Sequence, residues 1–256
     1  MNTPGQMQQH RSRPLILLLF CLTAVVSVSA QGGPPLLTDD PGTAEYKHWE
    51  INLAVLSEIR HDSRNFELPL ADFNYGANEH TQLKFEIPVL ARWSDSGSHV
   101  EAGNGNFGVK WRFVDQEKHG FDLSTYPQFS FNTLGPKRLV DRGMHLLLPL
   151  QIAKSFGKFQ MNADGGYIIN QHSMDELSFG LAAGYQATKT LELLAELHSV
   201  PLRNFESNES VFQLGGRKKF SEHYIFLFAA GRGIPGSSDR EPKFLGYFGM
   251  QIIIGK

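Results

Sequence analysis

The sequence predicts an all-β protein, a single up-and-down antiparallel transmembrane β-barrel of about 12 strands that follows a cleaved signal peptide. Three observations predict this fold class. The first thirty residues have the pattern of a secretory signal, and the rest of the chain alternates between apolar and polar residues with period two. In addition, short and long connections between these segments alternate along the chain.

The composition excludes several other classes of protein. The chain has 256 residues, of which 41% are hydrophobic and 20% charged, and it has a single Cys, so it is neither a disordered chain nor a disulfide scaffold. Its formal net charge is only −2 and its basic residues are scattered. We therefore expect no nucleic acid as a partner.

Residues 1–30 are expected to be a signal peptide. Basic residues, among them Arg11 and Arg13, precede an apolar run over 14–28, and cleavage is expected after Ala30. The run is short for a membrane anchor, and the large Phe20 before Cys21 disfavours a lipoprotein. Cleavage would remove the only cysteine and two arginines and leave 22 basic against 26 acidic residues, without any disulfide. Residues 31–47 then form a lead-in segment and residues 48–256 the barrel.

The barrel strands are expected where apolar and polar residues alternate. In 81–93, for example, Leu83, Phe85 and Ile87 lie on one face and Lys84 and Glu86 on the other. In 65–76, 144–156, 224–233 and 243–254 the pattern is mixed and leaves the register open. The twelve segments are 49–59, 65–76, 81–93, 107–113, 121–133, 144–156, 159–170, 176–187, 191–198, 211–220, 224–233 and 243–254.

The connections indicate which rim each turn belongs to. Barrels of the outer membrane of Gram-negative bacteria carry short turns at the periplasmic rim and long loops at the other. An even number of strands puts both chain ends at the periplasmic rim. Short connections are expected at 77–80, 115–120, 157–158, 188–190 and 221–223, and the other class at 61–64, 94–106, 134–143, 171–175, 199–209 and 234–242, of which only 61–64 is short.

The charged residues on the polar faces predict a wet interior. In a dry sandwich core each charge would need a partner or cost several kcal/mol, whereas in a water-filled lumen it stays hydrated. The apolar faces then contact lipid, and aromatic residues near the segment ends suit the two membrane interfaces. The residues expected to line the lumen are Glu50, Glu58, Glu67, Lys84, Glu86, Arg92, Lys110, Arg112, Asp122, Glu196 and Arg217.

Two stretches near the start of the exported part carry a family resemblance. One is Pro34-Pro35-Leu36-Leu37-Thr38-Asp39-Asp40-Pro41-Gly42-Thr43, followed by His48-Trp49-Glu50-Ile51-Asn52-Leu53; the other comprises 70–76 and 82–88. They resemble the family of outer-membrane barrels named for the MetA pathway of phenol degradation and labelled "transporter". The resemblance implies an outer-membrane protein that passes small, aromatic or apolar compounds, and no catalytic residues. Many such barrels end on an aromatic residue that the assembly machinery recognises, whereas this chain ends Ile254-Gly255-Lys256.

The adjacent acids Asp39 and Asp40 leave two interpretations open. In one, they cap a turn of a periplasmic lead-in. In the other, the segment folds into the lumen, the acids meet the basic patch of Lys84, Arg92, Lys110 and Arg112, and a constriction results. A calcium site lacks the further spaced oxygen ligands that it needs. The acids of the first two strands and the bases of the next two can likewise form opposed clusters across the lumen or ordinary cross-strand pairs.

Enzymatic and metal sites have weak support in the sequence. The histidines, among them His119 and His172, show no metal-ligand spacing, and we expect no cofactor. His172-Ser173 and His198-Ser199 are sequence neighbours, so their side chains would point to opposite faces of a strand, which disfavours a lipid-modifying enzyme.

The function expected from these features is passive diffusion of small solutes. Twelve strands lie between the filled eight-stranded barrels and the open porins of sixteen or more, so the lumen should be narrow. The partners are then membrane lipid, a small-molecule solute and the outer-membrane assembly machinery. The alternatives are a surface-interaction barrel with a plugged lumen, the enzyme above, and a secreted soluble β protein.

Overall fold

The computed structural model describes residues 33–95, 97–133, 138–139, 143–236 and 241–255. The expected signal peptide, 1–30, lies outside the described residues, as does most of the expected loop 134–143. The described part of the chain is nearly all strand, and its one helix is α1 (Gln116–His119). No helix among these residues is long and apolar enough to cross a membrane.

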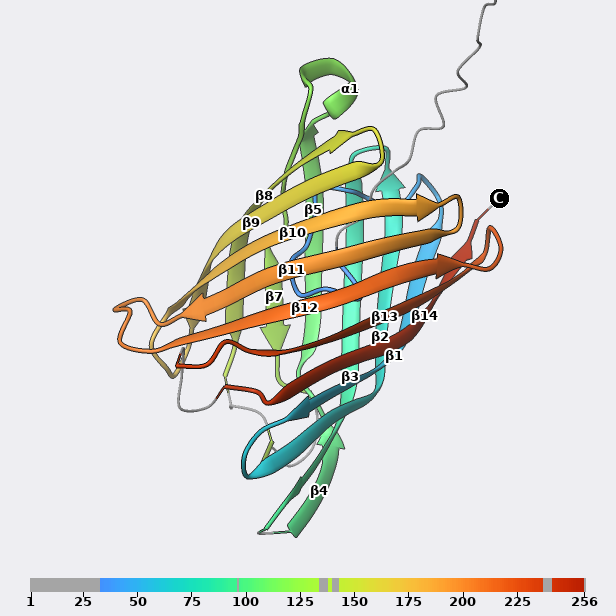
Figure 1. Cartoon of the computed structure of the whole chain (residues 1–256). Helices are drawn as coiled ribbons and strands as arrows, with labels where there is room; N and C mark the ends of the chain where they lie inside the picture. The colour runs from blue at the N-terminus through green and yellow to red at the C-terminus, as the bar shows by residue number, and fades with distance from the viewer. Residues whose placement is uncertain (1–32, 96, 134–137, 140–142, 237–240, 256) are drawn as a thin grey trace, which may run out of the picture.

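The strands form one closed antiparallel barrel, as the sequence predicted (Figure 1). β1 pairs with β2 on one side and with β14 on the other, where Trp49 faces Ile254. The strands are β1 (Trp49–Ile59), β2 (Ser63–Asn78), β3 (Thr81–Ser94), β4 (Gly97–Ala102), β5 (Gly105–Val114), β6 (Asp122–Thr125), β7 (Gln128–Phe131), β8 (His145–Phe156), β9 (Phe159–Asn170), β10 (Glu176–Thr188), β11 (Leu191–Pro201), β12 (Asn208–Lys219), β13 (Tyr224–Gly233) and β14 (Phe244–Ile254).

These fourteen strands make a barrel of twelve because two barrel strands are interrupted. β4 and β5 both pair with β3, and β6 and β7 both pair with β8. Between β6 and β7 stands Pro127, which has no N–H to donate to the ladder.

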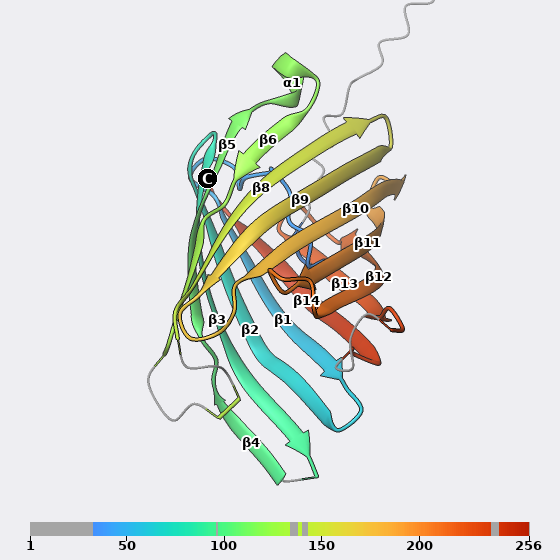
Figure 2. The ribbon, with the colours of Figure 1, turned by 90° about the vertical axis from the view of Figure 1, so that its left-hand side faces the viewer.

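One expected loop is a strand instead. The segment 94–106 contains β4, which pairs with the distal half of β3 from Val89–Ala102 to Ser94–Gly97. This hairpin extends the barrel wall beyond the rim opposite the chain ends (Figures 1 and 2). Val100 is the only large apolar residue of β4, so the alternation that revealed the other strands is missing there.

The two rims carry the connections in the expected order. Residues 79–80, 157–158, 189–190 and 220–223 turn at the rim where β1 begins and β14 ends, and α1 also lies there (Figure 1). The other rim carries 60–62, 171–175 and 202–207. We refer to it below as the distal rim.

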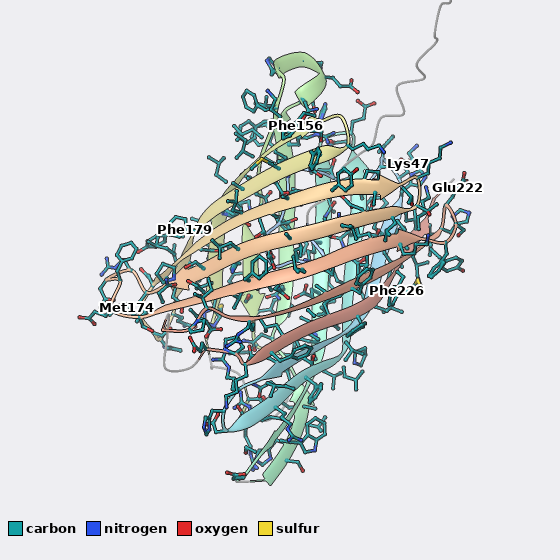
Figure 3. All side chains as sticks on the ribbon, in the orientation of Figure 1. Lys47, Phe156, Met174, Phe179, Glu222 and Phe226 are labelled. Carbon is teal, nitrogen blue, oxygen red and sulfur yellow. The ribbon has the colours of Figure 1, made fainter. Side chains whose placement is uncertain are left out.

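The outer surface of the barrel is apolar. Leu83, Trp111 and Leu214 are exposed, and in Figure 3 Phe156 and Phe179 project outward from the wall. Aromatic pairs gather near the rim of the chain ends, where the rings of Trp49 and Tyr75 lie 4.8 Å apart and those of Phe159 and Tyr185 4.7 Å apart. Such a surface suits the hydrocarbon and interfacial layers of a membrane.

The interior, in contrast, is mostly polar. Asn52, Asp72, Gln151, Glu196 and Gln213 are all buried inside the barrel. Apolar side chains therefore face outward and charged ones inward, the reverse of a soluble β-sandwich.

Candidate functional site

A segment of the chain lies inside the barrel (Figures 1 and 2). Residues 33–47 precede β1 and form turns and bends rather than a strand of the wall. Their backbone bonds to side chains that reach inward from β3, β9, β11 and β12. We call residues 33–47 the inserted segment.

Arg217 of β12 holds the beginning of the inserted segment. Its Nη2 donates to the carbonyl oxygen of Gly33 at 3.1 Å and to that of Pro34 at 2.9 Å, and its Nε also donates to Pro34 at 3.1 Å. Its Nη1 lies 3.2 Å from Oε2 of Glu192 on β11. The guanidinium is therefore compensated in charge while its donors fix the segment.

Glu196 of β11 binds the middle of the inserted segment. Its carboxylate accepts hydrogen bonds from the backbone N–H of Thr38 at 2.8 Å and of Leu37 at 3.0 Å, and from Nε2 of Gln213 at 2.6 Å. Thr38 in turn packs against β10 at Gly180, where a Cβ would lie 2.5 Å from Oγ1 of Thr38. A buried carboxylate with several N–H donors is satisfied without a cation.

Lys110 of β5 binds the inserted segment from the opposite wall. Its Nζ donates to Oδ1 of Asp39 at 2.9 Å and to the carbonyl oxygen of Asp40 at 2.7 Å, and lies 4.9 Å from the ring centre of Tyr126. Asp164 of β9 accepts the backbone N–H of Asp39 at 3.0 Å. The segment thus spans the lumen between β5 and β9.

The two adjacent aspartates have different electrostatic surroundings. Burial raises the pKa of the Asp39 carboxyl, but the charges of Lys110 and Lys84 more than offset this and hold the pKa below its usual value of 3.8. For Asp40, burial dominates over the attraction of Lys110 and raises the pKa to about 7. Oδ1 of Asp40 accepts the N–H of Gly42 at 2.6 Å, which closes an Asx turn.

The end of the inserted segment is held by β2 and β3. Oε1 of Gln82 accepts the N–H of Ala44 at 2.8 Å, and the N–H of Lys47 donates to the carbonyl oxygen of Gly76 at 2.8 Å. A Cβ at position 76 would overlap the backbone carbonyl of Glu45. Gly76 is therefore required for this close approach.

Apolar contacts add to these hydrogen bonds. Leu36 is buried against a cluster of small and apolar side chains that point inward from the wall. Besides Leu36, the cluster comprises Ala54, Leu70, Ala182, Leu194, Leu227, Ala229 and Tyr247.

A cavity of about 640 Å³ remains beside the inserted segment. Its described lining comes from the inserted segment, β1–β3, β5, Tyr126, β7, the loop residue Leu139, β12 and β14, with nothing from β6, β8–β11 or β13. The inserted segment thus fills the lumen next to β9–β11, and the open space follows the wall of β1–β3.

Acids outnumber bases among the residues that line this cavity. The four bases are Lys84, Arg92, Lys110 and Arg217. The eight acids are Asp39, Asp40, Glu50, Glu58, Glu67, Asp72, Glu86 and Glu209.

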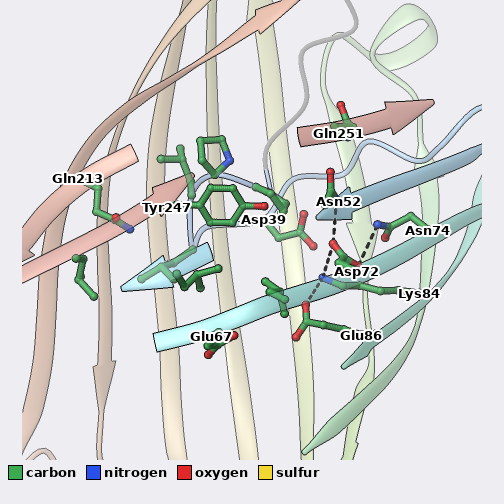
Figure 4. Close-up of a pocket in the computed structure, with 18 of the residues that line it drawn as sticks. Asp39, Asn52, Glu67, Asp72, Asn74, Lys84, Glu86, Gln213, Tyr247 and Gln251 are labelled. Carbon is green, nitrogen blue, oxygen red and sulfur yellow. Dashed lines mark hydrogen bonds and ion pairs between the residues drawn. The ribbon is translucent and has the colours of Figure 1, made fainter. Parts of the chain in front are cut away.

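Many of these charges are paired (Figure 4). Nζ of Lys84 lies 3.6 Å from Asp72 and 3.3 Å from Glu86, and Asp72 also accepts hydrogen bonds from Asn52 and Asn74 at 3.0 and 3.1 Å. Lys84 thus pairs across the strands with Asp72 on β2 and along its own strand with Glu86.

A second group of charges lies nearer the distal rim. Arg60 joins β1 to β12, because its guanidinium contacts Glu58 at 2.5 Å and Glu209 at 3.1 Å. Nε of Arg92 donates to Oδ1 of Asn65 at 2.6 Å. Of these side chains, Glu58, Asn65, Arg92 and Glu209 line the cavity.

The structure does not bring all the expected lumen residues to this cavity. Arg112 lies at the rim of the chain ends, 3.0 Å from Asp115, and Asp122 accepts the N–H of Gln116 at the start of α1. Glu196 is covered by the inserted segment. Of the basic patch, Lys110 contacts Asp39 directly, whereas Arg92 and Arg112 contact other groups. The other expected residues, Glu50, Glu58, Glu67, Lys84, Glu86, Arg92, Lys110 and Arg217, line the cavity, as do Asp39 and Asp40.

Several interior residues were missed by the sequence reasoning. Asp72 lies in a segment whose mixed pattern hid its face, because the register of β2 shifts between Glu67 and Leu70. Asn52 and Gln213 alternate correctly, but uncharged amides do not stand out in a search for charges. Glu209 lies in an expected loop that is in fact the start of β12.

A Ser–His contact within the barrel also escaped the sequence reasoning. Oγ of Ser178 on β10 lies 3.3 Å from Nε2 of His198 on β11. In the described part of the chain no carboxylate forms an ion pair with His198, and no cluster of His, Cys, Asp or Glu could hold a metal ion.

Comparison with known proteins shows the fold but no family. No family model and no curated sequence matches this chain. The COG4313 outer membrane channel from Pseudomonas putida F1 is 14% identical, with a TM-score of 0.65 over 88% of this chain and 100% of that one. The KdgM porin is 9% identical (TM-score 0.51, 78% and 98% of the two chains), and the NanC porin 6% identical (0.52, 80% and 99%).

Proposed function

We propose that this protein is an outer-membrane channel of Gram-negative bacteria through which small solutes, aromatic and apolar compounds among them, diffuse passively. The observation that carries the proposal is the cavity of about 640 Å³ that remains open beside the inserted segment, with charged and polar walls. A polar lumen behind an apolar outer surface is the arrangement of solute channels in the outer membrane. The likeness in fold to the COG4313 channel and the sequence resemblance to the MetA-pathway family support the same function.

The inserted segment is the proposed constriction. It crosses the lumen from Lys110 to Glu196, and among the described residues the cavity lies beside it along β1–β3. The pathway is therefore narrow and the flux of solute through it is low. Membrane lipid and the solute are the proposed partners of the protein. Folding into the membrane relies on the outer-membrane assembly machinery.

Reconstitution tests the channel. The full chain, refolded and placed in planar bilayers and liposomes, is expected to conduct ions in small steps and to let small solutes swell the liposomes while excluding oligosaccharides. Because acids outnumber bases in the cavity, the reversal potential in a KCl gradient should favour cations. A folded barrel that passes neither ions nor solutes would contradict the proposal.

Substitution tests the constriction. Asp39→Asn removes the carboxylate that pairs with Lys110 and is expected to shift the reversal potential toward anions, because the lysine is then uncompensated. Asp40→Asn is measured alongside it, and Glu222→Gln, in an exposed turn, is the matched control. Unchanged selectivity in both aspartate variants would remove the inserted segment from the ion path.

A surface-interaction barrel with a plugged lumen is the second candidate. The several anchors of the inserted segment favour it, because they are those of a fixed plug. A lipid-modifying enzyme has less support, since Ser178 and His198 lack the acid that orients the base in a hydrolytic triad.

A further inference from the structure

Glu67 is a carboxylate of the cavity wall with leucines on both neighbouring strands. It lies on β2 next to the register shift, and its partners in the sheet are Leu56 on β1 and Leu90 on β3. All three residues line the cavity, and so does Leu70. Glu67 therefore has a leucine as its neighbour on each adjacent strand. Figure 4 shows it beside the group of Lys84, Asp72 and Glu86.

Glu67 has no protein partner within the described residues, whereas its neighbours do. Two further carboxylates, Glu58 and Glu86, lie near enough to repel its ionised form. Glu58 is bound by Arg60 and Asn65, and Glu86 by Lys84 and Asn106. The Glu67 side chain is partly buried, and no hydrogen bond or ion pair of the described chain reaches it.

An uncompensated carboxylate in such a place is costly unless a ligand supplies the positive charge. Burying an ion away from water is unfavourable, and pairing with an opposite charge recovers much of the cost. Because Glu58 and Glu86 already have basic partners, Glu67 is the carboxylate of this group that remains open to a cation, and the leucines favour an apolar body over a fully hydrated ion. The cavity volume lies in the range of small-molecule sites.

We propose that Glu67 anchors a lumenal binding site for a small organic cation, in which an ammonium group meets the carboxylate and an apolar body lies against Leu56, Leu70 and Leu90. The inference rests on the proposed function, because it assigns a class of solute to the same lumen. The ammonium donates hydrogen bonds to the carboxylate of Glu67, which accepts none from the described chain.

Calorimetric titration tests the site without requiring transport. The refolded full chain in detergent is titrated with 2-phenylethylammonium chloride, and in parallel with the neutral 2-phenylethanol and with KCl. The wild type is expected to bind the amine at least about tenfold more tightly than the alcohol, as the loss of one charge-assisted hydrogen bond predicts. Equal binding of amine and alcohol, or displacement of the amine by equimolar KCl, would overturn the proposal.

Two variants that each remove one negative charge distinguish direct binding of the amine by Glu67 from attraction by the overall negative charge of the cavity. Glu67→Gln is expected to weaken amine binding about tenfold or more, whereas Glu86→Gln, which removes a carboxylate that Lys84 already compensates, should weaken it less than about threefold. Similar losses in both variants would contradict the assignment of the anchor to Glu67. Heat-dependent gel mobility verifies that each variant is folded, and the wild-type comparison of amine with alcohol does not depend on either.

Planar-bilayer recordings test the binding site and the channel function separately. The amine is expected to reduce KCl conductance in a concentration-dependent way that Glu67→Gln weakens. A barrel that conducts but binds no amine would overturn the site and leave the channel standing. A barrel that binds the amine but passes no ions would overturn the channel and leave the site.

Discussion

Asp40 is a carboxyl of the inserted segment whose pKa burial raises to about 7. It is only 2% exposed, its Oδ1 accepts the N–H of Gly42, and its Oδ2 is buried with no hydrogen-bond partner in the described chain. Asp39 repels its ionised form, while Lys110 and Arg217 attract it. Burial outweighs that attraction, so a proton stays on Asp40 up to a pKa of about 7.

Binding of the inserted segment to the wall is therefore expected to weaken as the pH rises. The bound segment keeps a proton on Asp40 up to a pKa of about 7, whereas a released segment loses it near 3.8. The contribution is complete below about pH 4 and is lost as the pH rises through 7. The lowered pKa of Asp39 acts in the opposite sense, but only below its usual value of 3.8.

Conductance at different pH values measures this effect. The wild type is expected to conduct more at pH 8 than at pH 5, and Asp40→Asn, which stays neutral, should flatten the difference. Asp122→Asn at the rim is the control for general titration of carboxylates. A pH profile that Asp40→Asn leaves unchanged would assign the titration to other groups.

At the scale of elements, β10 is shaped to receive the inserted segment. Gly180 faces Thr38, whose side chain is fully buried and occupies the place of a Cβ. On β9, the outward-facing Gly165 has only ordinary contacts, with a Cβ 3.8 Å from the ring of Phe179. A methyl group added at position 180 would therefore clash with Thr38, whereas one added at position 165 would fit without a clash.

Gly180→Ala is expected to displace the inserted segment and to raise single-channel conductance. The new methyl group would overlap Thr38 and Asp164, so the segment must shift away from the wall. Gly165→Ala is the matched control and should leave conductance within the range of the wild type. Equal conductance in both variants would mean that the segment at Thr38 does not limit the ion path.

β2 shows how one irregularity decides a site. Its pairing shifts between Glu67 and Leu70, and beyond the shift Leu70, Asp72 and Asn74 point inward. The same shift leaves Glu67 lining the cavity between Leu56 and Leu90. A bulge thus turns a mixed pattern of residues into a consistent inner face.

At the scale of the whole molecule, the barrel is closed but unevenly filled. Hydrogen bonds run around the full ring, since β1 pairs with β14 as well as with β2. The inserted segment occupies the side of β9–β11, and the cavity follows β1–β3. Closure pairs each of the twelve barrel strands with two neighbours, although β4 beyond the distal rim pairs with β3 alone. The asymmetry confines solutes to the charged wall.

Closure predicts heat-modifiable mobility in gels. Without boiling, the protein in SDS should keep its barrel and migrate differently from the boiled chain, because every barrel strand pairs with a neighbour on each side. It should also require detergent for solubility, since its outer surface is apolar. A protein that remains in buffer without detergent and shows one mobility would contradict a membrane barrel.

The sequence alone determined the barrel, the number of its strands and the rim of each turn that the structure describes in full. Residues such as Leu83 and Phe85 alternate with Lys84 and Glu86 because lipid outside and a polar interior impose opposite demands on successive side chains. That requirement is local and recurs every two residues. The alternation of apolar and polar residues is missing in β4 and is interrupted at the register shift in β2. There the sequence predicted a loop in place of β4 and left the register of β2 open.

Only the tertiary structure decided how the lumen is arranged. Lys110, Glu196 and Arg217 are 70, 158 and 183 residues away from the groups of the inserted segment that they bind. A polar side chain in the sequence does not reveal which distant group it will meet. Any inward-facing charge can be satisfied by water, by a neighbouring strand or by an inserted segment. The choice among these depends on closure of the ring, which brings distant residues together around one cavity.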